Sequence, residues 1–243
     1  MTRDAGRHER KIRIGQLYPS GGLCEDEMPR MAPDVVRFLT TRMPFRKAGL
    51  DDDAALARDV EFHASLLADA RVELIAFNCT AASLITGPQV INRRIEAATG
   101  IRSVTTIEGV LEGLDAARIR RFALLTPYLP EVVAHEVAYF RERGFEVTQC
   151  AGAPCADPVA QGSIPPQRWL ELARTLRKDD CDGLLVSCGG IQLSAVLGGI
   201  EREFDRPVIA SNQALLWACL RRLALPDRPS GFGALLAGAF DPR

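Results

Sequence analysis

Residues 72–83 read VELIAFNCTAAS, and residues 182–194 read DGLLVSCGGIQLS. Each stretch is a short apolar run with the composition of a buried strand, followed by a cysteine, Cys79 or Cys188, and then by small residues. Runs that are apolar on both faces are typical of strands in parallel sheets. The two stretches therefore predict an α/β fold with a cysteine at the carboxyl end of one strand in each half of the chain.

The rest of the chain repeats this alternation of short apolar runs and longer amphipathic stretches. Further strands are predicted at KIRIGQLY, RRFALLT, FEVTQC and RPVIAS, and helices at residues 52–69, 86–98, 107–116, 131–143, 166–178, 192–204 and 211–223. Strands and helices that alternate at this spacing indicate mostly parallel strands. In such folds ligands bind beyond the carboxyl ends of the strands, where both cysteines stand.

The two halves also place similar residues at similar intervals. Cys79 lies 60 residues after Pro19, and Cys188 lies 61 residues after Pro127, and each proline follows an opening strand. The residues between them hardly match, so chance and internal duplication both remain open. If the halves are duplicated, a pseudo-twofold axis would point both thiols into one cleft from opposite sides.

Composition excludes several functions. Thirty Lys and Arg against 31 Asp and Glu give a net charge of −1, which provides no basic field for nucleic acid or an anionic membrane surface. No apolar run reaches the roughly 18 residues that a membrane span needs, and the charged N-terminal stretch lacks the apolar core of a leader. Seven scattered cysteines fit free thiols in a reducing compartment. We expect a soluble cytoplasmic protein.

The cysteine positions suggest chemistry as well as packing. Gly189 and Gly190 allow a tight turn that exposes backbone N–H groups at a helix predicted to begin near Ile191, and this position would hold an anion and lower the pKa of the Cys188 thiol. Such a thiol serves as a base or a nucleophile. The alternative is a small buried side chain, which is the usual role of a free cysteine. Cys79 has the same placement, with the hydroxyl of Thr80 beside it.

Other chemistries lack candidates. His8, His63 and His135 are isolated, so no zinc site is predicted, and none of the three lysines is placed to hold pyridoxal phosphate. Neither a phosphate loop nor a dinucleotide fingerprint occurs. We interpret the acidic runs 25–27 and 51–53 as solvated or first-turn charge and as a helix N-cap, in preference to metal sites. No metal or cofactor is predicted.

Six motifs carry a resemblance to a known family. They are YPSGG at 18–22, EDEMP at 25–29, TTRMPFRK at 40–47, NCTAAS at 78–83, TPYLPEV at 126–132 and SCGG at 187–190. With these motifs the chain resembles the cofactor-independent aspartate/glutamate racemase superfamily, and within it the branch of maleate isomerases and arylmalonate decarboxylases. The resemblance implies two Rossmann-like lobes with parallel four-stranded sheets and the active site between them. The first lobe would comprise residues 1–116 and 212–243, and the second lobe residues 117–211.

The resemblance also implies roles for individual residues. Cys79 would be the nucleophile or first base, and Cys188 the acid and base on the opposite face of the substrate. The implied substrate-binding residues lie in the matching motifs: Pro19, Ser20, Thr80, Ala81, Tyr128, Gly189, Gly190 and Arg42. Arg42 can equally be a structural ion-pair partner at a strand end.

Three departures bear on the substrate. Maleate isomerases typically have asparagine where Gly22 stands, the decarboxylases have serine where Ala81 stands, and residues 155–166 differ from the carboxylate-binding segment of maleate isomerases. We therefore expect an isomerase, either cis-trans or racemising, that acts on a small carboxylate. A decarboxylase that uses Cys188 alone and a non-catalytic carboxylate-binding protein remain open. The apolar residues 215–217 would permit a homo-oligomer.

Overall fold

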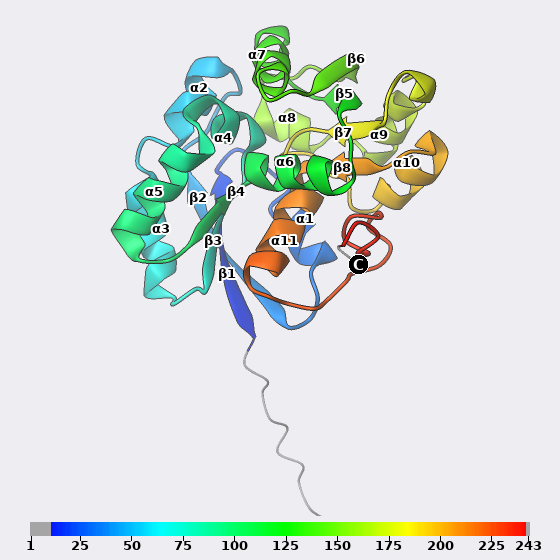
Figure 1. Ribbon diagram of the computed structural model, residues 1–243. Helices are drawn as coiled ribbons and strands as arrows, with labels where there is room; N and C mark the ends of the chain where they lie inside the picture. Colours follow the sequence, from blue (N-terminus) through cyan, green and yellow to red (C-terminus); the bar gives the residue numbers. More distant parts are fainter. Residues whose placement is uncertain (1–10, 242–243) are drawn as a thin grey trace, which may run out of the picture.

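The computed structural model of the chain describes residues 11–241, and Figure 1 shows its ribbon. His8 and nearly all of the charged N-terminal stretch discussed above lie outside these residues. Eight strands form two separate sheets within the described chain. The strands are β1 (Ile12–Pro19), β2 (Val36–Met43), β3 (Leu74–Phe77), β4 (Ser103–Thr105), β5 (Arg121–Thr126), β6 (Glu146–Gly152), β7 (Gly183–Val186) and β8 (Val208–Ala210).

The two sheets have the same topology. Their strand orders are β2-β1-β3-β4 and β6-β5-β7-β8, and all pairs are parallel. The central strands β3 and β7 are buried along their whole length, as their continuous apolar composition requires. The predicted α/β fold with two parallel four-stranded sheets is confirmed. Cys79 follows β3 after one residue, and Cys188 follows β7 after one residue, so the two thiols occupy corresponding places in the repeat.

Helices cover both faces of each sheet (Figure 1). They are α1 (Glu27–Met31), α2 (Leu50–Leu56), α3 (Val60–Asp69), α4 (Thr80–Thr86), α5 (Pro88–Thr99), α6 (Thr106–Ala116), α7 (Pro130–Arg141), α8 (Pro158–Gly162), α9 (Pro166–Ala173), α10 (Leu197–Phe204) and α11 (Ser211–Arg222), with a short 3-10 turn, η1, at Lys178–Asp180. Local signals fix several ends: Thr105 and Glu108 form a capping box before α6, and Gly100 closes α5 in the left-handed conformation.

Three details of the sequence-based prediction were wrong. Strands β2 and β4 were not predicted, because β2 carries only two buried residues and β4 only three residues in all. The helix predicted at 52–69 is two helices, since Arg94 donates hydrogen bonds to the carbonyl oxygens of Ala57 and Arg58 at the break. The helix predicted to start near Ile191 begins only at Leu197.

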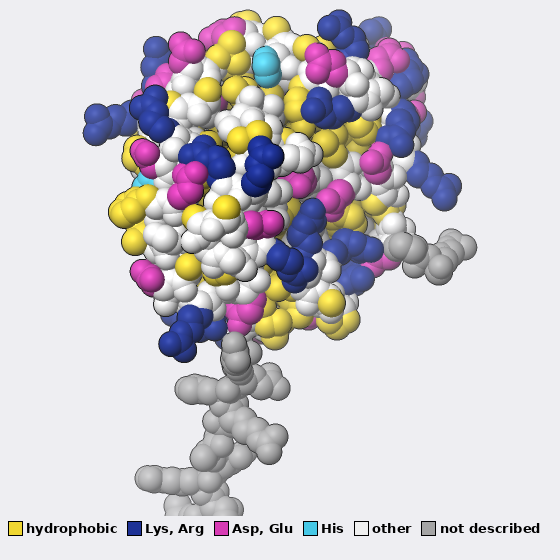
Figure 2. Space-filling view, turned by 60° about the vertical axis from the view of Figure 1, so that its left-hand side comes forward, with side chains coloured by type: hydrophobic (Ala, Val, Ile, Leu, Met, Phe, Trp, Pro, Cys, Tyr) yellow, Lys and Arg dark blue, Asp and Glu magenta, His cyan; other side chains and the backbone are white. Residues whose placement is uncertain are grey.

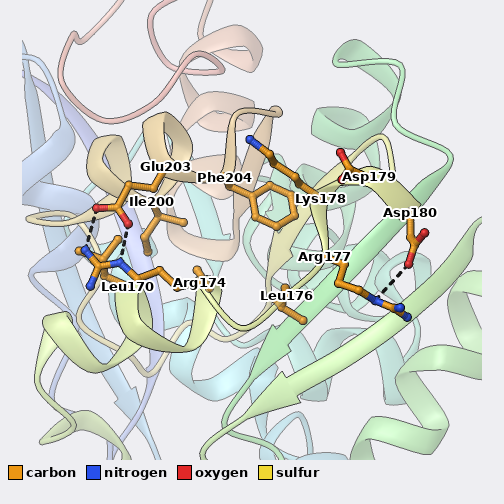
Figure 3. Close-up of a pocket in the computed structure, with 11 residues that line it drawn as sticks. Leu170, Arg174, Leu176, Arg177, Lys178, Asp179, Asp180, Ile200, Glu203 and Phe204 are labelled. Atoms are coloured by element: carbon orange, nitrogen blue, oxygen red, sulfur yellow. Dashed lines mark hydrogen bonds and ion pairs between the residues drawn. The ribbon is translucent and has the colours of Figure 1, made fainter.

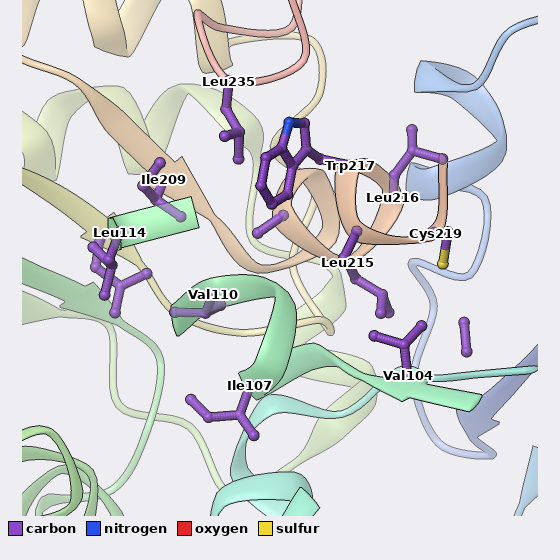
Figure 4. Close-up of a cluster of buried hydrophobic side chains, with 14 of the residues drawn as sticks. Val104, Ile107, Val110, Leu114, Ile209, Leu215, Leu216, Trp217, Cys219 and Leu235 are labelled. Carbon is purple, nitrogen blue, oxygen red and sulfur yellow. The ribbon is translucent and has the colours of Figure 1, made fainter. Parts of the chain in front are cut away.

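Helices α6 and α11 join the two halves. Each follows the last strand of its own half, and they pack against each other between the sheets, where both contact β8 and both contact β4 (Figure 1). Leu215, Leu216 and Trp217 of α11 lie in this core with Val110 and Leu235 (Figure 4). The apolar patch expected at residues 215–217 is therefore buried, and it provides no surface for self-association. Self-association itself stays a prediction, as does the division of the lobes at residues 116 and 211.

The surface agrees with a nearly neutral chain. Basic and acidic side chains alternate over the face shown in Figure 2 and leave no large area of one sign. Among residues 11–241, no helix has both the length and the apolar character that crossing a membrane requires.

Candidate active site between the lobes

Cys79 and Cys188 line one small cavity between the two halves. Its volume is about 30 Å³, roughly the space that one water molecule takes in the liquid, so a larger ligand enters only if the walls move apart. The other lining residues come from the carboxyl ends of the strands and from α2 and α8: Tyr18, Pro19, Gly22, Phe45, Ala48, Asp53, Asn78, Ala81, Tyr128, Pro158, Gln161, Gly189 and Gly190. The repeated topology thus brings the two thiols, 109 positions apart in the sequence, to the wall of one site.

Cys79 is held at the start of α4. It is the N-cap residue of this helix and is 9% exposed. Its side chain makes no capping hydrogen bond of standard geometry, although the backbone N–H groups of Ala81 and Ala82 are near enough to favour its thiolate. Its Sγ also lies 4.0 Å from Oδ1 of Asp53, within hydrogen-bonding range for a thiol.

Cys188 lies in the turn after β7 and is 6% exposed. Its Sγ accepts hydrogen bonds from the backbone N–H of Gly190 and from Nε2 of Gln161, both at 3.1 Å. The Tyr128 hydroxyl is buried and makes no hydrogen bond of standard geometry, although it is near enough to favour the thiolate of Cys188. These donors can stabilise negative charge on the sulfur or on a bound anion.

The expectation of a lowered thiol pKa was wrong for the empty site. Burial raises the pKa of Cys188 to about 12 despite its hydrogen bond from Gly190, and burial together with Asp53 raises the pKa of Cys79 well above its ordinary value. Two causes of the expected decrease are missing. The helix after Cys188 begins too late to act on it, and no Lys, Arg or His of the described chain lines the cavity.

A hydrogen-bond network from the first turn of α11 fixes the two cysteine segments relative to each other. The Ser211 Oγ accepts the Thr80 hydroxyl at 2.8 Å and the Cys188 N–H at 3.1 Å. Asn212 accepts from Nδ2 of Asn78 at 3.0 Å and donates to the carbonyl of Gly189 at 3.1 Å. The residues next to each thiol are thus bonded to the same dipeptide, which restricts the separation of the thiols.

Seven of the ten predicted site residues line the cavity, and three do not. Those that line it are Cys79, Cys188, Pro19, Ala81, Tyr128, Gly189 and Gly190. Thr80 points to Ser211 as described, and the Ser20 hydroxyl accepts the Phe45 N–H. Arg42 pairs with Glu25 at 2.6 Å and donates to the carbonyls of Ser20 and Gly22. Arg42 is therefore a structural ion-pair partner, which stabilises the loop after β1 from outside the cavity.

Four polar residues of the cavity were missed: Tyr18, Asp53, Asn78 and Gln161. Asp53 was interpreted as N-cap charge, but the N-cap of α2 is Gly49, and Asp53 is turned inward. Its helical spacing from the buried Leu56 and Val60 could have indicated this. Gln161 lies on the short helix α8, and nothing in its sequence context marks it.

Tyr18 explains one departure from the maleate isomerases. A Cβ atom at Gly22 would lie 2.6 Å from the Tyr18 ring, so an asparagine cannot occupy this position while Tyr18 keeps its place. The Tyr18 hydroxyl accepts the N–H of Cys24 at 2.9 Å. Tyr18 therefore occupies the space beside Gly22 that an asparagine side chain would need.

Glu27 connects the halves beside the site. The acidic run 25–27 was interpreted as solvated or first-turn helix charge, and Glu27 does lie in the first turn of α1, but it is buried. Its carboxylate accepts the N–H groups of Leu193 and Ser194 at 2.8 and 2.7 Å and the Ser194 hydroxyl at 2.9 Å. These bonds keep the loop before α10 from continuing as a helix.

Glu27→Gln is expected to lower the free energy of unfolding by about 2 kcal/mol. The neutral amide oxygen accepts weaker hydrogen bonds than the carboxylate does, and the amide NH2 group would face a group that is itself a donor. Urea denaturation measures the loss. Glu131→Gln, at an exposed position of α7, is the control and should change stability by less than about 0.5 kcal/mol. Equal effects of the two substitutions would contradict the role of Glu27.

Glu136 is a second buried carboxyl group, behind Cys188. One oxygen accepts the hydroxyl of Ser187, the other has no partner, and burial raises its pKa to about 7. A carboxyl group whose pKa is higher in the folded state stabilises the protein below its unfolded pKa, and this contribution is lost as pH rises through the folded pKa. Stability should therefore fall by about 3 kcal/mol between pH 4.5 and pH 7 on account of Glu136. Thermal melts of Glu136→Gln between pH 4.5 and pH 7 should show a loss of stability that is smaller by this amount than in the unmodified chain.

A larger cavity lies elsewhere in the described part of the chain. It has a volume of about 440 Å³ and opens on the outer side of the second half, between α9, η1 and α10 (Figure 3). Arg174 pairs with Glu203 at its edge, and Arg177 pairs with Asp180. Neither cysteine of the small cavity reaches it.

Comparison with known proteins agrees with this geometry. The model of the arylmalonate decarboxylase family matches residues 14–236. A maleate isomerase of Nocardia farcinica is 31% identical over 92% of this chain and 95% of its own length, and an arylmalonate decarboxylase of Bordetella bronchiseptica is 26% identical over 86% and 89%. A solved cysteine-to-serine mutant of the Nocardia farcinica maleate cis-trans isomerase, with a covalently bound succinylcysteine intermediate, superposes with a TM-score of 0.88 at 28% identity and covers 93% of this chain and 98% of its own.

Proposed function

The chain belongs to the arylmalonate decarboxylase family, and we propose that within this family it is a cofactor-independent cis-trans isomerase of a small unsaturated dicarboxylate of the maleate type. The observation that carries the proposal is the pair of thiols, Cys79 and Cys188, that line the same small cavity. A decarboxylase that works through Cys188 alone has no use for the second thiol. The 31% identity to a maleate isomerase over nearly the whole chain supports the same choice.

Substrate binding depends on neutral donors, since the described residues bring no cationic side chain to the cavity wall. One carboxylate would accept the backbone N–H groups at the start of α4, which lie near the Cys79 sulfur. The other would accept the unpaired hydroxyl of Tyr128 and the amide of Gln161. Several preorganised dipoles in a water-poor site can replace an ion pair.

The reaction uses the two thiols in sequence. The Cys79 sulfur forms a bond to one alkene carbon, and the π electron pair moves onto the adjacent carboxylate as an enediolate. Cys188 delivers its proton to the second alkene carbon, which leaves a succinyl thioether whose central carbon bond is single and can rotate. Cys188 then removes a proton from that carbon, the double bond re-forms in the trans geometry, and the carbon–sulfur bond to Cys79 breaks.

The thiols can act only while reduced. All seven cysteines of the chain are unpaired, which suits a reducing compartment such as the cytoplasm.

Proton NMR in D2O tests the proposal. Maleate incubated with the protein should lose its olefinic signal and give that of fumarate, with deuterium at the carbon that Cys188 protonates. Release of carbon dioxide from an arylmalonate, with maleate unchanged, would instead support the decarboxylase. Thermal stabilisation by maleate without any new signal would indicate a binding protein, and both results would refute the isomerase.

A further inference from the structure

Three carboxyl groups of the described chain are buried, and the reaction above uses none of them: Glu27, Asp53 and Glu136. Glu27 is fully engaged with the loop before α10, and Glu136 lies behind Ser187, outside the cavity. Only Asp53 lines the cavity. Its role is therefore the open question of the site.

The fold directs the Asp53 carboxyl group at the Cys79 thiol. Asp53 is in the first turn of α2, which packs against α4, and its side chain is nearly inaccessible, with the residue 3% exposed. Oδ1 lies 4.0 Å from Cys79 Sγ, and Oδ2 accepts only the long 3.4 Å bond from the Gly49 N–H. None of the ion pairs within residues 11–241 involves Asp53, and the nearby Arg46 and Lys47 are exposed.

The attack on the substrate requires a group that removes the thiol proton. Cys79 is a neutral thiol in the empty site, because burial disfavours its thiolate. Among the residues that line the cavity, no His or Lys is present, and burial raises the pKa of both Tyr18 and Tyr128. Asp53 is the only side chain in the wall that can be ionised as a base near neutral pH.

We propose that Asp53 is the general base that takes the proton of the Cys79 thiol as its sulfur attacks the substrate. The S–H proton passes to Oδ1 while the sulfur electron pair forms the carbon–sulfur bond, so Asp53 becomes neutral as negative charge moves to the substrate. When the carbon–sulfur bond breaks, Asp53 returns the proton to the departing sulfur. The identity of the electrophile rests on the proposed function, but the transfer from thiol to carboxylate does not.

The electrostatics of the site suit this exchange. Burial raises the pKa of Asp53 to about 7, opposed by the hydrogen bond from Gly49 and reinforced by the charge of Asp52. The other titratable groups that face it are Cys79 on α4, Cys188 after β7 and Tyr128 after β5. Each of these groups becomes negatively charged when it loses its proton, so its ionisation is disfavoured while the Asp53 carboxylate is charged. Moving the proton from Cys79 to Asp53 creates the thiolate without creating a second negative charge.

The test measures alkylation of Cys79 by iodoacetamide as a function of pH, with the modified residue identified by peptide mass mapping. In the unmodified chain the rate should rise through an apparent pKa near 7. In Asp53→Asn, which keeps the side-chain volume, this rise should vanish and the rate at pH 7.5 should fall by roughly 10²-fold. Asp51→Asn, at an exposed position of the same helical turn whose charge is not among the causes of the raised Asp53 pKa, is the control and should leave the profile unchanged.

The opposite result has a clear meaning. If Asp53 acts on Cys79 only by repelling the thiolate, its removal lowers the thiol pKa, and Asp53→Asn reacts as fast as the unmodified chain or faster, which refutes the proposal. Circular dichroism checks that the variant is folded. Should it be unfolded, Asp53→Ala with added formate is the second variant, and failure of formate to restore the rate also refutes the proposal. Because alkylation needs no substrate, these outcomes are independent of maleate turnover.

Discussion

Cys79→Ala is expected to lower kcat/KM for maleate by roughly 10⁴-fold, because without the sulfur no covalent bond to the alkene forms and its double bond cannot become single. The measurement is the initial rate of fumarate formation by NMR. The substitution removes one buried thiol from the first turn of α4 without altering the backbone N–H groups of Ala81 and Ala82, so substrate should still bind. Thermal stabilisation by maleate should therefore persist in the variant.

Cys150→Ser is the control for general effects of losing a thiol, since Cys150 is exposed on the edge strand β6 and lies outside the cavity. Its activity should match that of the unmodified chain. A decarboxylase that works through Cys188 predicts a different result, namely substantial turnover of an arylmalonate after Cys79→Ala. That result would remove the central role assigned to Cys79.

The second large effect is expected for Cys188→Ser. A serine hydroxyl is too weak an acid and base to exchange protons with the second substrate carbon, so turnover should fall by roughly 10³-fold. The attack of Cys79 is not removed, and a succinyl adduct should accumulate on it. Intact mass spectrometry would then show an increase equal to one molecule of maleic acid, which peptide mapping should assign to Cys79. The related Nocardia farcinica variant holds a succinylcysteine of this kind.

Cys181→Ser is the matched control, because Cys181 lies in the same half at the same 6% exposure but outside the cavity. It should neither slow turnover nor accumulate an adduct. An adduct on Cys188 in the Cys79→Ala variant, with turnover retained, would reverse the roles of the two thiols.

Strands were predictable from the sequence where they are buried on both faces, because such strands consist mostly of apolar residues. Six of the eight strands could be predicted, since runs such as those of β3 and β7 are apolar on both faces. Strand β2 could not, because it lies at the edge of its sheet with mostly half-exposed residues and pairs only with β1. The start of α10 could not either, since the Glu27 carboxylate that terminates the preceding backbone lies more than 160 positions earlier in the sequence.

The candidate site divides in the same way. Residues that follow a buried strand directly, such as Cys79 and Gly189, were predictable because the carboxyl ends of parallel strands meet at one edge of the sheet. Residues that reach the cavity from elsewhere were not, and Gln161 on α8 is the clearest example. Ser211 and Asn212 were predicted only as the junction between a strand and a helix, and their bonds to both cysteine segments depend on how α11 packs between the sheets.

The sequence by itself determined the repeated α/β pattern and the placement of a cysteine after the third strand of each half, because buried strands and their ends are encoded within a few adjacent residues. Only the tertiary structure decided the ionisation of those cysteines. A thiol pKa depends on burial and on the charges within a few ångströms, and these come from segments far apart in the chain. Folding buries both thiols without a cation and places the Asp53 carboxyl group 4.0 Å from Cys79. An aspartate that sequence context assigns to a helix N-terminus thereby becomes the base nearest to the nucleophile.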